Sequence, residues 1–398
     1  MTSSNAAARP LQGLKVLDAS SIIAGPMIGG VLGDYGADVV KIEHPNGDDS
    51  RNLGSSENST DLWWKFLNRG KRCVTLNLGS PDGAEAFAEM AKDADVVIEN
   101  FRPGRFDAWG LTYDRLSADN HGLLLLRLTG FGQEGPYAQR PGFGTLAEAM
   151  SGVAHLTGEP DGPPILPGFA LGDMLAGIIG AAAAGFALWA RDRPDGTQRG
   201  CEIDLSLTGS LLYVLGPQMV EFDRLERSPI RRGNSAGRWP RNTHQCSDGA
   251  WIAYSAVSFR MVRRLLEAVE HGEDPRFADA EKAQTHGAVV DQLFGAWVAQ
   301  HEREHVLKTL AALQVPAAPI NDASAVANDP HFAERHLARV PDGERDVLMP
   351  IGPFRIDGEP AVARHAGPAK GTSNDEILGD RRHLSAENHA ALRAPHPF

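Results

Sequence analysis

Asp173 has the surroundings that best suit covalent chemistry. It follows Gly172 in LPGFALGDMLAG (166–177) and precedes an uncharged run at 174–190 that predicts a helix. An aspartate at a helix start commonly caps a free backbone N–H, which would be a structural role. The same position favours the ionised carboxylate, and small neighbours leave it room to act as a nucleophile. Asp173 is therefore a candidate catalytic residue with a competing structural interpretation.

Two further motifs are weaker candidates for chemistry. GFGQEG (130–135) fits the dinucleotide pattern G-x-G-x-x-G, but Pro136 follows at once and no acid stands at the required distance. The loop better suits close backbone approach to another ligand. HEREH (301–305) fits the zinc pattern H-E-x-x-H, but its flanks are charged and no third ligand is evident. A solvated helix face is favoured, with a zinc hydrolase as an alternative of a different class.

A cationic segment offers another kind of site. Residues 224–241 hold six arginines and one glutamate in a chain of net charge −12. Arginine binds phosphate and carboxylate through paired donors, so Arg231 and Arg232 are candidates for an anion site, and a solvated linker is the competing interpretation. The negative balance argues against nucleic acid or an anionic membrane as main partner, but not against a small anionic ligand.

The apolar pattern predicts the elements that position these side chains. Valine- and isoleucine-rich runs alternate with helical segments through 14–43, 71–78, 81–91, 93–100 and 122–130, which predicts an open, doubly wound α/β sheet. Further strands are expected at 201–207, 250–257 and 315–320, and strand-like stretches at 346–350 and 353–356. Further helices are expected at 145–154, 258–270 and 288–313.

Cysteine content and apolar segments bear on the compartment. The chain of 398 residues has three cysteines, far apart in sequence, which fits a reducing cytoplasm better than a disulfide framework. The first ten residues show no signal-peptide pattern. The uncharged run at 174–190 reaches the lower limit for a membrane span, but its glycine and alanine content favours a tightly packed helix of a soluble protein.

Several stretches spread over most of the chain have an order and spacing that are specific together, although each stretch alone is weak. They include LQGLKVLDAS (11–20), LGDYGADVVKIEHPNGDDSR (32–51), ADVVIENFRPG (94–104), LTGFGQEGPYAQRPGFG (128–144), LGDMLAG (171–177) and GCEIDLSL (200–207). In these stretches the chain resembles the class III CoA-transferases, the CaiB/BaiF family that includes formyl-CoA transferase, carnitine CoA-transferase and α-methylacyl-CoA racemase.

The resemblance implies how the chain is divided. It implies a Rossmann-like large domain made from both chain ends, residues 10–210 and 331–398. A linker at 211–248 and an inserted small α/β domain at 249–330 would lie between them. It also implies two subunits threaded through each other as an interlocked homodimer, which would bury a large apolar interface.

The resemblance also implies a mechanism, because the catalytic aspartate of the family falls on Asp173. Its carboxylate would attack an acyl-CoA thioester, and the acyl transfer would proceed through covalent aspartyl intermediates. Backbone N–H groups of Gly132, Gly142 and Gly144 are candidates to stabilise the oxyanions. No tightly bound cofactor and no metal are expected, because coenzyme A enters as a substrate.

The CoA site of the family lies at the carboxyl ends of the first strands. There, phosphate groups need cations and loop N–H groups. One departure is Ser21, which stands where formyl-CoA transferase has a histidine, so the resemblance does not define the adenine contacts at this position. The residues that match the CoA site are Ser21, Ile22, Ala24, Lys71, Arg72, Asn100 and Arg105.

Phe143 distinguishes two activities within the family. It lies thirty residues before Asp173, where racemases place a catalytic histidine, and phenylalanine cannot move a proton. A transferase is therefore favoured over a racemase unless His155 or Glu148 substitutes. The 224–241 segment and the stretch around Arg140 resemble members that handle dicarboxylates, with succinyl-CoA as a donor. A catalytically inert acyl-CoA binder is the remaining alternative.

Overall fold

The computed structural model describes residues 9–57, 60–235 and 237–379, which form two compact units. Unit 1 contains the described residues up to Val153, Pro167–Gly216 and those from Ala333. Unit 2 contains Ala154–Leu166 and Pro217–Phe332. Residues 154–166 and 217–248 therefore belong to unit 2, whereas we expected the first range in the large domain and the second in a linker.

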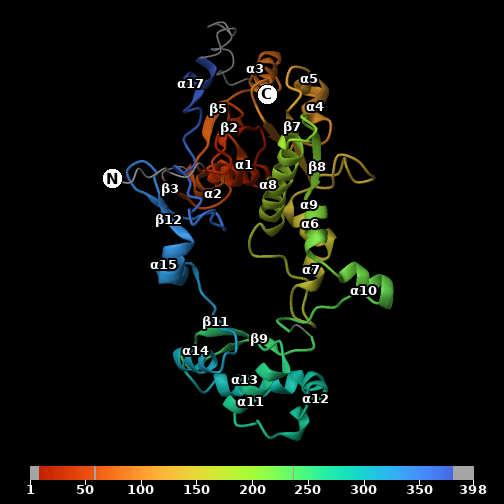
Figure 1. Cartoon of the computed structure of the whole chain (residues 1–398), viewed down its shortest axis with the longest axis vertical. Helices are drawn as coiled ribbons and strands as arrows, with labels where there is room; N and C mark the ends of the chain where they lie inside the picture. The colour runs from red at the N-terminus through yellow and green to blue at the C-terminus, as the bar shows by residue number, and fades with distance from the viewer. Residues whose placement is uncertain (1–8, 58–59, 236, 380–398) are drawn as a thin grey trace. The chain divides into compact units, whose positions relative to one another are not determined.

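Unit 1 is built on six parallel strands in the order β5-β2-β1-β6-β7-β8. Figure 1 labels β5 and β2 toward one side of this sheet and β7 and β8 toward the other. The prediction of an α/β fold with a parallel sheet is confirmed. The chain starts in the middle of the sheet and winds outward in both directions, so the strand order reverses between β1 and β6. The strands are β1 (Lys15–Asp18), β2 (Asp38–Glu43), β5 (Arg72–Thr75), β6 (Val96–Glu99), β7 (Leu124–Thr129) and β8 (Glu202–Ser206).

Helices cover both faces of this sheet. On one face, alternate strand residues such as Leu17 and Val97 pack against α3, and on the other, Val16 and Val96 pack against α1 and α8. This two-sided burial explains why the strands are almost continuously apolar. The helices of unit 1 are α1 (Ala24–Asp34), α2 (Leu62–Leu67), α3 (Pro81–Ala91), α4 (Arg105–Ala108), α5 (Tyr113–Ala118), α6 (Gly144–Ser151), α8 (Leu171–Asp192), α9 (Leu207–Val214) and α17 (Asn374–Gly379).

The long apolar helix α8 packs tightly on α1. A Cβ atom at Gly177 would lie 2.6 Å from the Met27 side chain, and one at Gly180 would lie 2.6 Å from Ile28. Glycine at these positions therefore lets the two helix backbones approach closely. By length and composition alone, α8 could cross a membrane. Its packing against α1 and the sheet is that of a core helix.

Unit 2 has its own core around an antiparallel sheet, β11-β10-β9. The predicted helix at 288–313 is wrong as one element, because the chain leaves the helix after Val298 and starts another at Arg303. The expected linker contains α10 and β9. The elements are α10 (Gln218–Leu225), β9 (Arg241–Gln245), β10 (Trp251–Ser255), α11 (Phe259–Ala268), η2 (Pro275–Phe277), α12 (Ala280–Thr285), α13 (Gly287–Val298), α14 (Arg303–Ala312), β11 (Ala317–Pro319) and α15 (Ala323–Asn328).

Short elements complete the described chain. The stretch at 353–356 forms no full strand, only an isolated bridge from Ile356 to Glu359. Two helices span the divisions between the units, α7 (Val153–Leu156) and α16 (Pro330–Arg335). The remaining elements are η1 (Asp49–Asn52) and the hairpins β3 (Ser56–Glu57) with β4 (Thr60–Asp61) and β12 (Leu337–Val340) with β13 (Val347–Pro350).

Candidate active site

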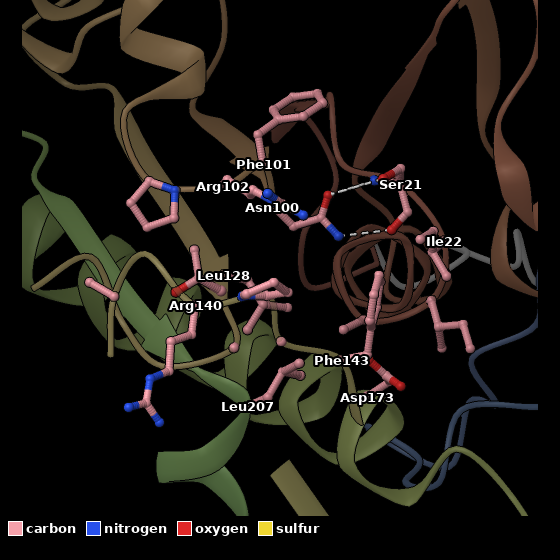
Figure 2. Close-up of a pocket in the computed structure, with 18 residues that line it drawn as sticks. Ser21, Ile22, Asn100, Phe101, Arg102, Leu128, Arg140, Phe143, Asp173 and Leu207 are labelled. Carbon is pink, nitrogen blue, oxygen red and sulfur yellow. Dashed lines mark hydrogen bonds between the residues drawn. The ribbon is translucent and has the colours of Figure 1, made fainter. Parts of the chain in front are cut away.

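The loops after β1 and β6 meet where the strand order reverses. The Ser21 N–H donates to Asn100 Oδ1 (2.7 Å), and Asn100 Nδ2 donates to the Ser21 carbonyl (2.8 Å) (Figure 2). Both residues line a cavity of about 220 Å³, together with Ile22 and Ala24 at the start of α1. In sheets of this kind, ligands bind in the crevice outside the carboxyl ends of the strands at the reversal. The cavity occupies that position.

Ile22 is held in an unusual backbone conformation. Its φ of 68° is left-handed, which is rare for a β-branched residue and costs about 1–3 kcal/mol. The Ile22 N–H donates to Asp48 Oδ1 (3.2 Å), and the buried Asp48 forms an ion pair with Lys41 (3.1 Å). Burial alone would raise the pKa of Asp48, but the Lys41 charge holds it below its ordinary value. An ionised, anchored carboxylate thus stabilises a strained turn at the cavity wall.

Asp173 lies in the first turn of α8 and lines the same cavity, beside Phe143 (Figure 2). Ala170 is the N-cap of α8, so Asp173 is not the capping residue. Its carboxylate accepts a hydrogen bond from the Gly144 N–H. A Cβ at Gly144 would overlap the Asp173 carboxylate, so this close approach requires glycine. The structural interpretation of Asp173 as a helix cap is therefore wrong.

The protonation of Asp173 suits a nucleophile. Burial raises its pKa to about 6, the negative charge of Glu148 adds to the rise, and the Gly144 N–H opposes it. Glu148 is itself buried on α6, and its Oε1 accepts from the Gly172 N–H (3.0 Å). At pH 7, a carboxyl group with a pKa of 6 is roughly 90 % ionised. Asp173 is thus more basic than an ordinary aspartate but still ionised, as covalent catalysis requires.

A second cavity of about 170 Å³ adjoins the first, because Ser21 and Phe101 line both. It lies at the carboxyl ends of β1, β2 and β5, and Trp109 forms part of its wall. The Arg105 guanidinium lies over the Trp109 ring, 5.1 Å from its centroid. Two adjoining cavities lined by aromatic and polar groups suit a ligand longer than either one.

Two predicted CoA contacts need correction. Lys71 is fully buried, and its ammonium donates to Asp18 Oδ2 (2.7 Å), the Pro26 carbonyl (2.7 Å) and Asn68 Oδ1 (3.0 Å). All three of its donors are therefore used inside the fold. Arg72 starts β5 at the opposite end of the sheet from the cavities, and it pairs with Asp38 and Glu376. Neither side chain faces either cavity.

The three glycines predicted to stabilise an oxyanion have different surroundings. Gly142 lines the first cavity, where its backbone packs against Gly130. The Gly144 N–H is bonded to the Asp173 carboxylate. Gly132 is not among the lining residues, and its N–H donates to Thr129 Oγ1 (2.9 Å), so the expectation for Gly132 is corrected.

The predicted anion-binding arginines are also placed differently. Arg140 lines the first cavity, but its guanidinium lies 3.7 Å from the Tyr137 ring centroid, and Figure 2 shows it directed away from Asp173. Within unit 2, Arg231 donates to the carbonyls of His155 (2.9 Å) and Gly162 (3.2 Å). The Arg231 guanidinium therefore links two backbone segments of unit 2 and has a structural role, rather than forming an open anion site. Arg232 is exposed.

The HEREH motif does not form a zinc helix. α14 begins at Arg303, so His301 lies outside it, and His301 Nδ1 contacts the Trp297 carbonyl (2.7 Å). The His301 and His305 rings stack with centroids 4.9 Å apart. Among the described residues, no group of three or more His, Cys, Asp or Glu side chains is placed to hold a metal ion.

Sequence reasoning missed four residues that contribute to the site. Asp48 lies in the stretch 32–51 that carries the family resemblance, so its position in the motif could have been a signal. Phe101 and Arg102 follow Asn100 directly and line the first cavity. Glu148 was considered only as a replacement base for a racemase. Its contact with the start of α8 joins two separate helices, and no local pattern announces it.

Comparisons with known proteins identify the family of this chain. The family model described as CoA-transferase family III matches residues 11–374. The chain is 34 % identical to the succinyl-CoA–D-citramalate CoA-transferase of Chloroflexus aurantiacus, covering 97 % of each. It is 36 % identical to the beta subunit of the succinyl-CoA–L-malate CoA-transferase of the same organism, covering 93 % of each.

A solved structure supports the same assignment. A CaiB/BaiF family protein from Brucella suis has a TM-score of 0.83 and 34 % identity, covering 93 % of this chain and 99 % of that one. CoA-transferases use CoA thioesters as substrates, which suits a buried carboxylate facing a cavity. The chain belongs to CoA-transferase family III and is an enzyme of the transferase class.

Proposed function

We propose that this enzyme moves CoA from an acyl-CoA thioester to a free carboxylate through a covalent intermediate on Asp173. The observation that carries this proposal is the Asp173 carboxylate itself, which faces a cavity at the strand reversal with a pKa of about 6. A carboxylate in this state can attack a thioester carbonyl. Two easier transfers then replace one difficult exchange between acids.

The proposed reaction proceeds in four steps, and each bond that forms is matched by one that breaks. An Asp173 oxygen attacks the thioester carbonyl, the C–S bond breaks, and a mixed anhydride and free CoA thiolate result. The thiolate attacks the Asp173 carbonyl carbon and releases the donor acid, which leaves an aspartyl-CoA thioester. The acceptor carboxylate attacks this thioester and frees the thiolate again. The thiolate finally attacks the acceptor acyl carbon, which forms the product thioester and regenerates the Asp173 carboxylate.

Backbone donors beside Asp173 support these steps. The Gly144 N–H holds the resting carboxylate, and Gly142 lines the cavity next to it. We assign both N–H groups to oxyanion stabilisation, where loss of one donor typically costs about 3–4 kcal/mol of activation free energy. Phe143 between them cannot move a proton, which favours transfer over racemisation.

The two adjoining cavities support one CoA-binding mode. We place the thioester end in the first cavity, next to Asp173, and the nucleotide end in the second. Ser21, Ile22, Ala24 and Asn100 line the first cavity, and Ser21 lines both. With Lys71 and Arg72 engaged elsewhere, the exposed Arg102 and Arg105 are the cations we assign to the CoA phosphates.

Succinyl-CoA is the proposed donor, and a dicarboxylate the proposed acceptor. The two Chloroflexus relatives are named as succinyl-CoA-dependent enzymes. Arg140 lines the first cavity, and we propose that it turns inward to bind the distal carboxylate. Arg140→Gln should raise KM for dicarboxylate acceptors tenfold or more, which corresponds to loss of roughly 1.5–3 kcal/mol, and leave KM for monocarboxylates unchanged. An equal rise for both classes would contradict this role.

We also propose an interlocked homodimer. α8 and α9 in unit 1 expose large apolar side chains, among them Phe186, Trp189 and Tyr213, which are 76 %, 68 % and 86 % exposed. Phe186 and Trp189 lie about one helical turn apart on α8, and exposed apolar side chains gathered in this way are typical of a protein interface. A second copy is the occupant that the family resemblance implies. Light scattering should give twice the chain mass of 42.7 kDa, and a monomer at micromolar concentration would refute the proposal. We further propose a soluble, cytoplasmic enzyme.

The covalent intermediate can be trapped directly. Incubation with succinyl-CoA followed by hydroxylamine should convert Asp173 to its hydroxamate, and peptide mass mapping would locate the change. The same treatment without succinyl-CoA is the control, and Asp173→Ala should give no adduct. Absence of any adduct and of CoA exchange with a panel of carboxylates would refute the proposal. Exchange of the α-proton with deuterated solvent would favour a racemase instead.

A further inference from the structure

Glu148 is a buried carboxylate that the proposed transfer steps do not use. It is 3 % exposed, it lies on α6, and its Oε1 accepts from the Gly172 N–H at the start of α8 (3.0 Å). Gly172 is the residue directly before Asp173. The capping residue Ala170 has no side-chain hydrogen bond to offer, so Glu148 supplies an acceptor that the helix start otherwise lacks.

The two helix starts meet closely enough for this contact to control Asp173. A Cβ atom at Gly172 would lie 3.1 Å from the Gly144 carbonyl oxygen, and the Gly144 N–H holds the Asp173 carboxylate. Glu148 follows Gly144 by one helical turn on α6. The same short helix therefore binds the backbone N–H of Gly172, directly before the nucleophile, and the carboxylate of Asp173 itself.

Glu148 is the charged side chain with the largest effect on the pKa of Asp173. Among the described residues, no cationic side chain contributes to the pKa of Asp173. α9 packs its apolar residues Leu207 and Leu211 into the core that contains α6, and its titratable Tyr213 is exposed. On α8, Arg191 and Asp192 lie at the far end of the helix. Arg140 lines the cavity but is directed away from Asp173 (Figure 2).

We propose that Glu148 is a positioning residue that anchors the first turn of α8 and places a fixed negative charge behind the nucleophile Asp173. This inference rests on the proposed covalent role of Asp173. A nearby negative charge makes a carboxylate more basic. For thiolates, nucleophilicity falls by roughly half a log unit for each unit of lost basicity, and a similar slope would apply to this carboxylate. The enzyme thus gains reactivity while Asp173 stays ionised at neutral pH.

Glu148→Gln tests the charge separately from the hydrogen bond, since the amide oxygen can still accept from Gly172. We expect the acid limb of the kcat/KM profile, near pH 6 in the parent enzyme, to move down by roughly one unit. The kcat on its alkaline plateau should fall about threefold. Ser151→Ala, another buried polar change on α6, is the matched control and should leave the acid limb in place. An unchanged acid limb in Glu148→Gln would overturn the inference.

A second measurement separates this inference from the proposed function. Carbodiimides modify protonated carboxyl groups, so the pH dependence of Asp173 labelling, followed by peptide mass, reports its pKa without turnover. The labelling midpoint should also fall in Glu148→Gln. A shifted midpoint in a protein that shows no CoA transfer would refute the function but leave the positioning role. Active enzyme with an unshifted midpoint would refute the positioning role alone.

Discussion

Two groups of buried carboxylates lie at the same edge of the sheet and differ in their partners. Asp18 and Asp48 are each paired with a lysine, at 2.7 Å to Lys71 and 3.1 Å to Lys41. Burial alone would raise their pKa values, but these lysines hold both below the ordinary value. Asp173 has a buried carboxylate neighbour instead of a cation, and its pKa is raised to about 6.

The difference separates structural carboxylates from a reactive one. A buried ion pair satisfies both charges and fixes the loops that carry them, as Asp48 fixes Ile22. An unpaired carboxylate keeps its basicity and its free electron pairs for a ligand, at a cost to the stability of the fold. The following substitutions test whether this division between the two groups is real.

The largest effect on activity should follow Asp173→Asn. Loss of the nucleophile should lower kcat by roughly 10⁴-fold or more, measured by CoA exchange between succinyl-CoA and a labelled acid. The same change should stabilise the fold at neutral pH. The raised pKa means that Asp173 contributes stability below pH 4 and loses it as the pH rises through about 6. Its ionised form therefore costs the folded protein about 1–3 kcal/mol at pH 7.5.

Urea unfolding at two pH values checks this second effect. Asp173→Asn should be more stable than the parent at pH 7.5, and the difference should disappear near pH 4, where both side chains are neutral. A variant that is less stable at pH 7.5 would show that Asp173 is a structural carboxylate like Asp18. The division between the two groups would then fail.

The largest effect on stability should follow Lys71→Met. It leaves Asp18 buried without its cation, which should destabilise the fold by about 3–5 kcal/mol in urea unfolding. The double variant Asp18→Leu with Lys71→Met should recover most of this loss, because it removes both charges. The folded fraction should keep the parent KM for succinyl-CoA. A KM that rises with the single change would restore Lys71 as a CoA contact.

Asn100→Asp introduces a new carboxylate into the lining of the first cavity. The carboxylate of the variant can still accept a hydrogen bond from the Ser21 N–H. It cannot donate to the Ser21 carbonyl as Asn100 Nδ2 does, so two negatively polarised oxygens would face each other there. Displacement of the Ser21 loop should lower kcat/KM for succinyl-CoA by about 10- to 100-fold. Asn100→Ser is a control without the added charge. An unchanged kcat/KM would show that the Ser21–Asn100 pair does not position CoA.

The buried ion pairs of Asp18 and Asp48 with lysine show which features of the fold the sequence could not predict. The alternation of strands and helices predicted the parallel sheet, because its signal is the local apolar run. Lys71 was assigned to CoA because it is a cation next to a strand, and nothing local shows that its side chain turns inward to Asp18, 53 residues away.

In unit 2, β9 has the polar sequence RNTHQ and was taken as part of a linker, because its pairing with β10 is not visible in its own residues.

Asp173, the buried carboxylate without a cationic partner, was partly predictable from the sequence. Asp173 stands in a motif that the family resemblance identifies, so its position was predicted. The helix start was expected to favour its ionised form, whereas burial and the Glu148 charge raise its pKa to about 6. That pKa depends on burial and on Glu148, a residue of another helix 25 positions earlier, which only the fold brings near. A motif can therefore name a reactive group, but the charges that tune its reactivity are a property of packing.

The smallest effect should follow Arg72→Gln, next to Lys71 in sequence. The Arg72 side chain is 34 % exposed, and its partners Asp38 and Glu376 are more exposed still. Such ion pairs contribute only about 0–1 kcal/mol, because water solvates both charges after the pair is lost. Urea unfolding should therefore barely change, and KM for succinyl-CoA should stay at the parent value because Arg72 lies at the other end of the sheet. A large rise in KM would place CoA phosphates at that end. A large loss of stability would mean that the exposed ion pairs of Arg72 stabilise the fold as much as the buried ion pair of Lys71 does.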